Sequence, residues 1–152
     1  MKKLTLTVAS LLFCGFLMAQ DFTPPAKAIA AFSAKYPDGT VQEWYEGYQD
    51  IECYFENDGQ YGSAHFSQSG TWLSSEITID ESELPRAVAE TLGEDFEGYE
   101  ITDVTYTVTP KSQQYAINIL NDVTEDNRIV TYDETGDLID EVVVDSEDDS
   151  TD

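Results

Sequence analysis

The fold is decided by a stretch that the chain contains in two versions. The first is HFSQSGTWLSSEITI, residues 65–79, and the second is TYDETGDLIDEVVVD, residues 131–145. Each reads as a strand, a tight turn and a second strand, because alternating apolar and polar residues flank Gly70 and Gly136. The sequence therefore predicts the same hairpin at two places in one short chain.

A helix pattern that begins at a proline precedes each hairpin region. The two patterns are TPPAKAIAAFSAKYP, residues 23–37, and SELPRAVAETLGEDF, residues 82–96. Proline is tolerated at a helix entrance because the N–H that it lacks has no partner in the first turn. Five pairs of matching positions lie sixty residues apart: Pro25 and Pro85, Ala28 and Val88, Phe32 and Leu92, Tyr36 and Phe96, Val41 and Ile101.

Strand patterns with period-two alternation follow each helix pattern, and short turns separate them. They cover residues 40–48, 50–56, 60–67 and 71–79, then 99–109, 113–121, 127–133 and 138–144. Strands joined by such short turns are antiparallel. The sequence therefore predicts an α+β fold, a tandem repeat of one helix packed on a four-stranded antiparallel meander, in two copies. The expected division is a signal peptide at 1–20, a first repeat at 21–80, a second repeat at 81–144 and an acidic disordered tail at 145–152.

The first twenty residues have the pattern of a secretory signal. Two lysines are followed by the apolar run Leu4–Met18 and by a small residue, Ala19, before Gln20. We expect cleavage near residue 20 and a periplasmic or secreted protein. Cys14 follows Phe13, whereas a lipidation signal has a small residue before the cysteine, so a lipid anchor is disfavoured. No second apolar segment follows, so no membrane insertion is expected.

Several structural motifs together resemble a known family. They are F-x-x-K-Y-P at residues 32–37, Trp44, F-x-x-x-G-x-W at 66–72 and L-P-x-A-V at 84–88. This pattern resembles the PepSY-like family of secreted bacterial proteins, whose fold is similar to that of beta-lactamase inhibitor protein. The resemblance covers nearly all of residues 22–144 and implies binding and inhibition of enzymes as the class of function. The second hairpin departs from the first, since Leu138 stands where Trp72 does.

The charge of the chain limits its partners. It has 31 acidic residues against seven lysines and arginines, with a formal net charge of −24. So few basic residues cannot form a phosphate-binding surface, which excludes nucleic acid as a partner and disfavours anionic lipid. The acidic surplus favours attraction of cations or of a basic protein.

No catalytic apparatus is visible in the sequence, so we expect no enzyme and assign no catalytic residues. His65 is the only histidine, and no nucleophile elbow, glycine-rich phosphate loop or Cys/His zinc spacing is present. Cys53 alternates with Ile51 and Phe55, which predicts a buried apolar thiol, with an intermolecular disulfide as the alternative.

Calcium is the one metal that the sequence favours at all, and no other cofactor is expected. Carboxylate and amide oxygens in Asp- and Asn-rich turns are its usual ligands, and such turns occur at 56–59, 121–127 and 132–137. None has the EF-hand order, and such residues are also common in ordinary turns. The best candidate ligands are Asp122, Glu125 and Asp126.

Period-two alternation also predicts a binding surface on the face of the first sheet opposite its helix. The outward positions are Trp44, Tyr48, Tyr54, Tyr61, His65 and Trp72. Tyrosine and tryptophan ringed by acids are typical of protein interfaces. Cross-strand aromatic pairs that only stabilise the sheet are the alternative, and a register slip of one residue would exchange the two faces.

The function predicted from the sequence is that of an exported non-catalytic binding protein. It would recognise a protein or peptide in the cell envelope and inhibit an envelope enzyme. The alternative is a calcium-binding or calcium-regulated periplasmic protein.

Overall fold

A computed structural model describes residues 22–144 of the protein, and the predicted signal peptide and acidic tail lie outside these residues. Within them, neither helix is long and apolar enough to cross a membrane. The elements in chain order are α1 (Ala26–Lys35), β1 (Thr40–Glu46), β2 (Asp50–Asn57), β3 (Gln60–Ser67), β4 (Trp72–Thr78), a 3₁₀ turn η1 (Glu81–Glu83), α2 (Arg86–Asp95), β5 (Glu100–Val108), β6 (Gln113–Asn121), β7 (Asp126–Asp133) and β8 (Leu138–Val143).

All eight strands belong to one antiparallel sheet in the order β1 to β8. The prediction of two copies, each with its own four-stranded meander, is therefore wrong. The finding that overturns it is the pairing of β4 with β5, which runs from Ser75 opposite Val108 to Thr78 opposite Thr105. Alternation and turn residues locate strands but do not say which strands end as sheet edges. An edge strand carries unpaired N–H and C=O groups, and β4 satisfies its own by pairing with β5.

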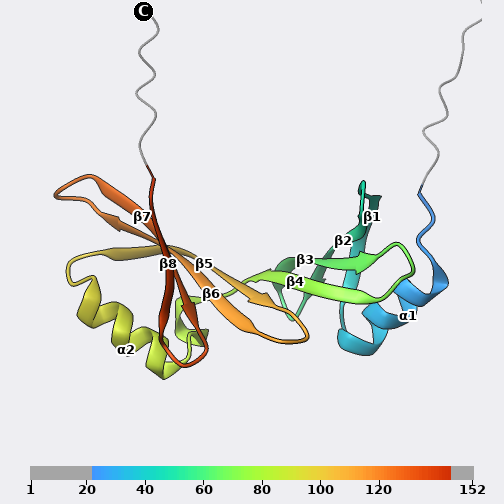
Figure 1. The fold of residues 1–152 in the computed structure, drawn as a ribbon, viewed down its shortest axis with the longest axis horizontal. Coiled ribbons are helices and arrows are strands. Elements are labelled where there is room, and N and C mark those ends of the chain that lie inside the picture. Colours follow the sequence, from blue (N-terminus) through green and yellow to red (C-terminus); the bar gives the residue numbers. More distant parts are fainter. Residues whose placement is uncertain (1–21, 145–152) are drawn as a thin grey trace, which may run out of the picture.

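Both helices pack on the same face of this sheet, along its lower side in Figure 1. Ile77 packs against the core beneath α1, and Tyr106 packs against the core beneath α2. These two residues are directly paired across β4 and β5, so they point to the same side of the sheet. Within residues 22–144, no helix lies on the opposite face.

Each helix covers its own group of buried side chains. The group beneath α1 consists of Ala28, Phe32, Ile51, Cys53, Phe55, Ala64 and Phe66. The group beneath α2 consists of Leu84, Val88, Leu92, Val104, Tyr115, Ile117, Ile119, Val130 and Tyr132. Alternate residues of each strand contribute to these groups, which is the pattern expected when one face of a sheet is buried.

The turns of the two repeated hairpins lie against the starts of the helices. Gly70 has a φ of +83°, and a Cβ there would lie 2.6 Å from the Ala28 nitrogen. Gly136 has a φ of +88°, and its Cβ would lie 2.9 Å from the Ala87 carbonyl carbon. Only glycine combines this backbone conformation with such a close approach. The turns of the two repeated hairpins therefore contact the first turn of each helix and restrict its position on the sheet.

Substitution of Gly70 tests the close approach between hairpin and helix. We expect Gly70→Ala to lower the free energy of unfolding by more than the ~1–2 kcal/mol cost of a left-handed non-glycine residue. The matched control is Gly59→Ala, because Gly59 has a φ of +80° but nothing within 4 Å of its Cβ position. Urea unfolding followed by circular dichroism measures both losses. Equal losses for the two variants would show that the contact with α1 contributes nothing.

Candidate functional site

The register of the sheet defines an open face, by which we mean the surface of β1–β4 that points away from α1. Its side chains pair with one another across the strands, as in Tyr45 with Glu52 and Ser63 with Glu76. The members are Glu43, Tyr45, Glu52, Tyr54, Tyr61, Ser63, His65 and Glu76. The open face therefore concentrates tyrosines and glutamates on a surface that no helix covers.

Tyr45 and Tyr54 form the aromatic centre of the open face. Their rings meet edge to face with centroids 5.4 Å apart, a geometry that aromatic pairs favour. The Tyr45 hydroxyl donates a hydrogen bond to the Glu43 carboxylate, which raises the pKa of Tyr45, and the Glu52 carboxylate likewise raises the pKa of Tyr54. Both phenols therefore stay neutral around pH 7, and their rings are held in place before any partner arrives.

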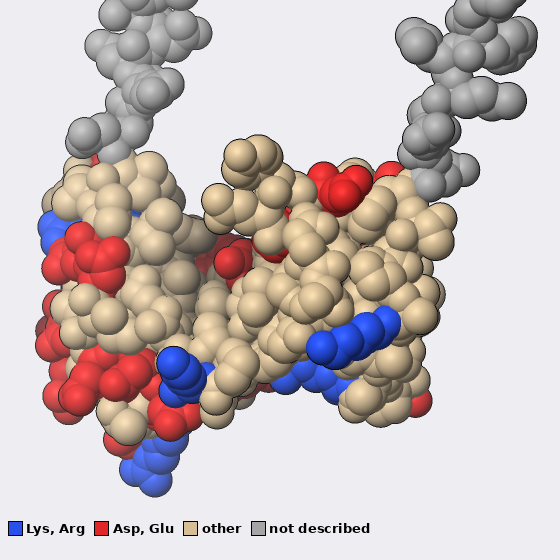
Figure 2. All heavy atoms as spheres, turned by 45° about the vertical axis from the view of Figure 1, so that its right-hand side comes forward, with Lys and Arg blue, Asp and Glu red and all other residues tan. Residues whose placement is uncertain are grey.

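A shallow hollow lies beside this pair, at the ends of β2, β3 and β4. It has a volume of about 300 Å³, and Tyr54, Tyr61 and Glu76 are among the residues that line it. Two exposed aromatic rings and one carboxylate thus border a space large enough for a side chain of a partner. In Figure 2 the upper surface dips between the two ends of the molecule, and acidic side chains lie in the dip.

His65 lies between two carboxylates on the open face. Its Nδ1 is 2.9 Å from Asp50 Oδ2, and its Nε2 is 3.7 Å from Glu52 Oε1. Neither ring nitrogen faces a serine or cysteine at hydrogen-bond distance within residues 22–144. The arrangement orients the imidazole on the surface and provides no nucleophile for it to activate.

The structure places Trp44 and Trp72 on the helix side, not on the open face. Trp44 packs against Phe32 and Phe66, with ring centroids 6.2 Å and 5.5 Å apart. Trp72 donates from Nε1 to Ser75 Oγ at 2.9 Å, and the Lys35 ammonium lies 3.7 Å above its ring. Both indoles are partly buried against the core beneath α1.

Two β-bulges account for this placement. The register shifts between Val41 and Glu43 in β1, and again where His65 and Phe66 of β3 pair with Ser74 and Trp72 of β4. Each bulge adds one residue, so every side chain beyond it points to the other face. Alternation counted without the bulges therefore assigns both tryptophans to the wrong side.

The register shift in β1 also explains why strict alternation does not place Tyr45 on the open face. Tyr45 belongs to the open face because it pairs with Glu52, although uninterrupted alternation turns it inward. A signal was present: Val41 and Trp44 are both apolar and lie three residues apart, which strict alternation does not allow on one face. Of the other predicted residues, Tyr54, Tyr61 and His65 lie together, while Tyr48 stands in the β1–β2 turn with 98% of its surface exposed.

Fluorescence tests the position of the tryptophans, since Trp44 and Trp72 are the only two in the chain. We expect acrylamide to quench the native protein several-fold less than the urea-unfolded protein, because both indoles pack against the core. A Trp44→Phe variant and a Trp72→Phe variant should each retain this protection. Native quenching as strong as in urea would place the indoles on an exposed surface.

In the second half, the helix-free face of β5 and β6 is mostly polar, and that of β7 and β8 includes the apolar pair Ile129 and Val142. The cross-strand pairs of β5 and β6 are Asp103 with Asn118, Thr105 with Ala116 and Thr107 with Gln114. Because β4 pairs with β5, this surface continues directly from the open face. The aromatic character is thus confined to the part built by β1–β4.

Cys53 is fully buried, as its position between Ile51 and Phe55 predicts. Burial raises the pKa of the Cys53 thiol to about 12, so the reactive thiolate is almost absent at neutral pH. The thiol therefore acts as a small apolar side chain of the core.

The burial of Cys53 predicts slow alkylation. At pH 8 we expect the Cys53 peptide to react with iodoacetamide at least tenfold more slowly in the native protein than in urea, as measured by peptide-resolved mass spectrometry. A native rate equal to the unfolded rate would contradict the buried position.

The candidate calcium ligands lie around the β6–β7 turn. Asp126 is held by Arg128, with Nη2 to Oδ2 at 2.6 Å, and it accepts a further hydrogen bond from the Tyr99 hydroxyl at 2.5 Å. Arg128 lowers the pKa of Asp126 most, with Tyr99 next. Glu125 stands in the turn with a φ of 56°. Over residues 22–144, no three or more His, Cys, Asp or Glu side chains are grouped so that they could hold a metal ion.

The fold and the open face define an α+β protein with one continuous sheet, two helices on one side and an exposed aromatic surface on the other. Solved structures share this fold. A BLIP-like protein from Bacteroides fragilis matches with a TM-score of 0.71 and 21% identity over 86% of this chain and 93% of that one. DUF2874 family proteins from Bacteroides uniformis and Bacteroides ovatus match with TM-scores of 0.68 and 0.70 and 20% identity each, over 80% and 84% of this chain and 90% and 93% of theirs.

These similarities show that the chain has a BLIP-like fold. They do not extend to the PepSY-like family, which the sequence motifs resemble. No protein-family model matches the sequence, and no curated protein matches it at a significant level.

Proposed function

We propose that this protein is an exported, non-catalytic binding protein whose open face recognises a protein or peptide in the cell envelope. The observation that carries the proposal is the exposure of three tyrosines on a helix-free sheet. Tyr45, Tyr54 and Tyr61 keep 42%, 45% and 57% of their surface exposed. A folded chain gains little stability from leaving large rings in water, and their burial against a partner recovers that free energy.

The geometry of the tyrosines supports recognition. Tyrosine has few rotatable bonds and offers both apolar area and a hydroxyl, so it loses little conformational entropy on binding. The Tyr45–Tyr54 edge-to-face contact and the Glu43 hydrogen bond already restrict both rings in the free protein. Such preorganisation lowers the entropic cost of association.

The surrounding charge indicates the type of partner. Glu52 and Glu76 lie beside the tyrosines, and the whole chain carries a formal charge of −24. Acidic surfaces accelerate encounters with basic partners, and this acceleration falls as salt is added. A partner with a basic patch around an apolar centre fits the open face best.

The proposal also includes export of the protein and inhibition of an envelope enzyme. The lysine start and apolar run of residues 1–20 support secretion through a cleaved signal. The BLIP-like name of one structural neighbour and the resemblance of the motifs to the PepSY-like family support enzyme inhibition as the consequence of binding. His65, flanked by two carboxylates, and Cys53, sealed in the core, offer no nucleophile to a substrate, which supports a non-catalytic role.

The test begins with capture of partners from envelope extract, followed by affinity measurements on each partner identified by mass spectrometry. We expect Tyr54→Ala/Tyr61→Ala to weaken the captured complex by about 30-fold, equivalent to about 2 kcal/mol for anchors at the centre of an interface. The matched control is Ile29→Ala, because Ile29 on α1 is also 45% exposed but lies on the helix side.

The variants must keep their melting temperatures for this comparison to hold, and the exposure of all three side chains predicts that they do. A partner whose affinity falls for Ile29→Ala and not for the tyrosine variant would contradict the proposal. Failure to capture any envelope protein with the wild-type chain would contradict it equally.

The calcium-regulated alternative remains a prediction with a separate test. Calorimetric titration with calcium decides it, since sub-millimolar binding together with a raised melting temperature would favour the metal role. Asp122→Asn/Glu125→Gln is the informative variant, because Asp126 already pairs with Arg128.

A further inference from the structure

The free edge of the sheet at β8 gathers most of the exposed apolar side chains of the second half of the molecule (Figure 1). Within residues 22–144, β8 pairs with β7 alone, and all six of its residues are exposed. The exposed apolar side chains on and directly after it are Leu138, Ile139, Val142, Val143 and Val144. An edge strand that combines unpaired backbone groups with apolar side chains is a template for a further strand.

The backbone of β8 offers hydrogen-bonding groups along this edge. The Val144 N–H donates to the Asn127 carbonyl oxygen at 2.8 Å. Residues of an antiparallel strand turn their backbone groups alternately toward and away from one neighbour. Because Asp140 to Val143 pair with β7 in one unbroken register, the N–H and C=O groups of Glu141 and Val143 point away from β7. No strand of the described region lies on that side, so these groups can pair with an added strand.

A cluster of polar side chains on the helix side fixes β8 before any strand is added. Arg128 of β7 donates to Asp126, with Nη2 2.6 Å from Oδ2, and also to the Glu141 carboxylate of β8. Asp126 accepts a second hydrogen bond from the Tyr99 hydroxyl. The edge is therefore held in register on β7, and an ordered edge lowers the entropic cost of pairing with another chain.

The strand at the other end of the sheet, β1, is protected against such pairing. Its register shifts between Val41 and Glu43, and Glu43 and Glu46 place charges along it. Bulges and charged side chains are two means by which proteins keep an edge strand from recruiting another chain. In β8 the register shift lies at the start of the strand, between Leu138 and Asp140, so the rest of the strand is regular.

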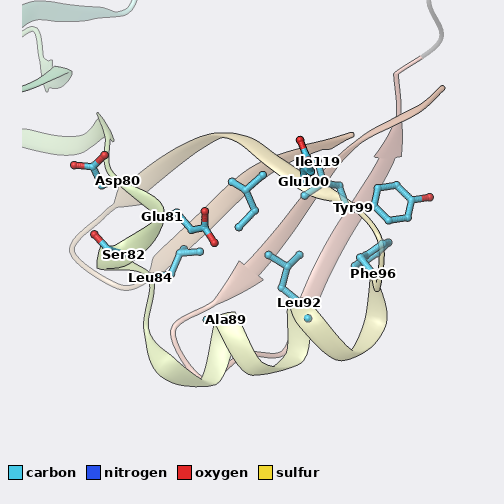
Figure 3. Close-up of a pocket in the computed structure, with 12 residues that line it drawn as sticks. Asp80, Glu81, Ser82, Leu84, Ala89, Leu92, Phe96, Tyr99, Glu100 and Ile119 are labelled. Atoms are coloured by element: carbon cyan, nitrogen blue, oxygen red, sulfur yellow. The ribbon is translucent and has the colours of Figure 1, made fainter. Parts of the chain in front are cut away.

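The hollow between η1, α2 and the start of β5 offers no comparable apolar surface (Figure 3). Leu92 of α2 and Ile119 of β6 are among its lining residues. Their side chains are only 6% and 1% exposed, so the hollow is closed at its centre. The exposed apolar surface of the second half is therefore concentrated at β8.

The charge around β8 distinguishes between a second copy of this chain and a basic strand. Residues 137–152 contain eight acids and no lysine or arginine. Within the described residues, Asp137 and Asp140 form no ion pair, whereas Glu141 is held by Arg128. Two copies joined edge to edge would bring these acids together, and each chain has a formal net charge of −24. Opposite charge on the added strand replaces this repulsion with attraction, so the charge favours a basic strand.

From this geometry we infer that the free edge of β8 binds an extended segment of another protein in which lysine or arginine flanks alternating apolar residues. The segment adds a strand to the sheet, and its backbone pairs with Glu141 and Val143. Val142 then lies where paired side chains approach most closely, and together with Ile129 it packs against an apolar side chain of the segment. Asp140 lies two residues away on the same face and pairs with a flanking cation.

The probes are two capped peptides, Lys-Thr-Val-Thr-Val-Thr-Lys and Glu-Thr-Val-Thr-Val-Thr-Glu, titrated at low salt into the chain of residues 21–152 and followed by NMR. At saturation we expect the lysine-flanked peptide to slow hydrogen exchange of the Glu141 and Val143 amides at least tenfold, because these N–H groups gain partners. The glutamate-flanked peptide should bind at least tenfold more weakly. Added salt should reduce the difference, because the preference arises from exposed carboxylates.

Two pairs of variants separate strand addition from general attraction to an acidic protein. Val143→Pro removes an N–H that β7 does not use, so we expect at least a tenfold loss of peptide affinity with little change in melting temperature. Its control, Val143→Thr, keeps the N–H and the β-branched shape and should bind within twofold of wild type. Asp137→Asn/Asp140→Asn should weaken binding several-fold, whereas Asp38→Asn/Glu46→Gln, which removes the same charge at the far end of the sheet, should change it less than twofold.

Full peptide affinity in Val143→Pro, an equal loss in the two charge variants, or unchanged exchange of the Glu141 and Val143 amides would overturn the inference. A dimer of the wild-type chain that Val143→Pro abolishes would overturn it too, by assigning the edge to a second copy. The Tyr54→Ala/Tyr61→Ala variant should bind the lysine-flanked peptide as wild type does, because the open face is built by β1–β4 at the other end of the sheet. The edge of β8 and the proposed function are therefore tested independently.

Discussion

The pairing of β4 with β5 is the interaction on which the rest of the structure depends. It runs from Ser75 opposite Val108 to Thr78 opposite Thr105 and joins strands that α2 separates in the sequence. Because the pairing fixes which side chains share a face, it places both helices on one side and leaves the other side bare along all eight strands. Without it, β4 and β5 would each be exposed edges, and no continuous helix-free surface would exist.

Much of the fold could be predicted from local pattern, because helices and strands are local consequences of spacing and turn chemistry. The proline-entered helices and the glycine turns at Gly70 and Gly136 are examples, and both turns meet the helix starts closely. The joining of the strands into one sheet was not predictable in the same way. The alternation of residues in β4 does not predict that this strand pairs with β5. The pairing depends on the path of the chain through α2, which brings β5 beside β4.

The candidate site was predictable to the extent that alternation was unbroken. Tyr54, Tyr61 and His65 lie in strands with a regular register and face outward as expected. Trp44 and Trp72 lie beyond bulges, where one extra residue reverses the face. A count by strict alternation assigns the wrong face beyond a bulge, although the three-residue spacing of Val41 and Trp44 marks the bulge in β1.

In the β1–β4 part of the sheet, the tryptophans lie on the helix side and the exposed tyrosines lie on the open face, and this division has a physical reason. Trp72 satisfies its single donor at Ser75 and lies beneath the Lys35 ammonium, so it can be partly buried without an unpaired polar atom. On the open face, Tyr45 and Tyr54 keep their hydroxyls near the carboxylates of Glu43 and Glu52, which raise the pKa of each phenol while the rings stay exposed. Beneath α2 the buried group combines aliphatic side chains with Tyr115 and Tyr132. Aromatic residues thus cover both sides of the β1–β4 part of the sheet, whereas Tyr106, Tyr115 and Tyr132 of β5–β7 all lie on the helix side.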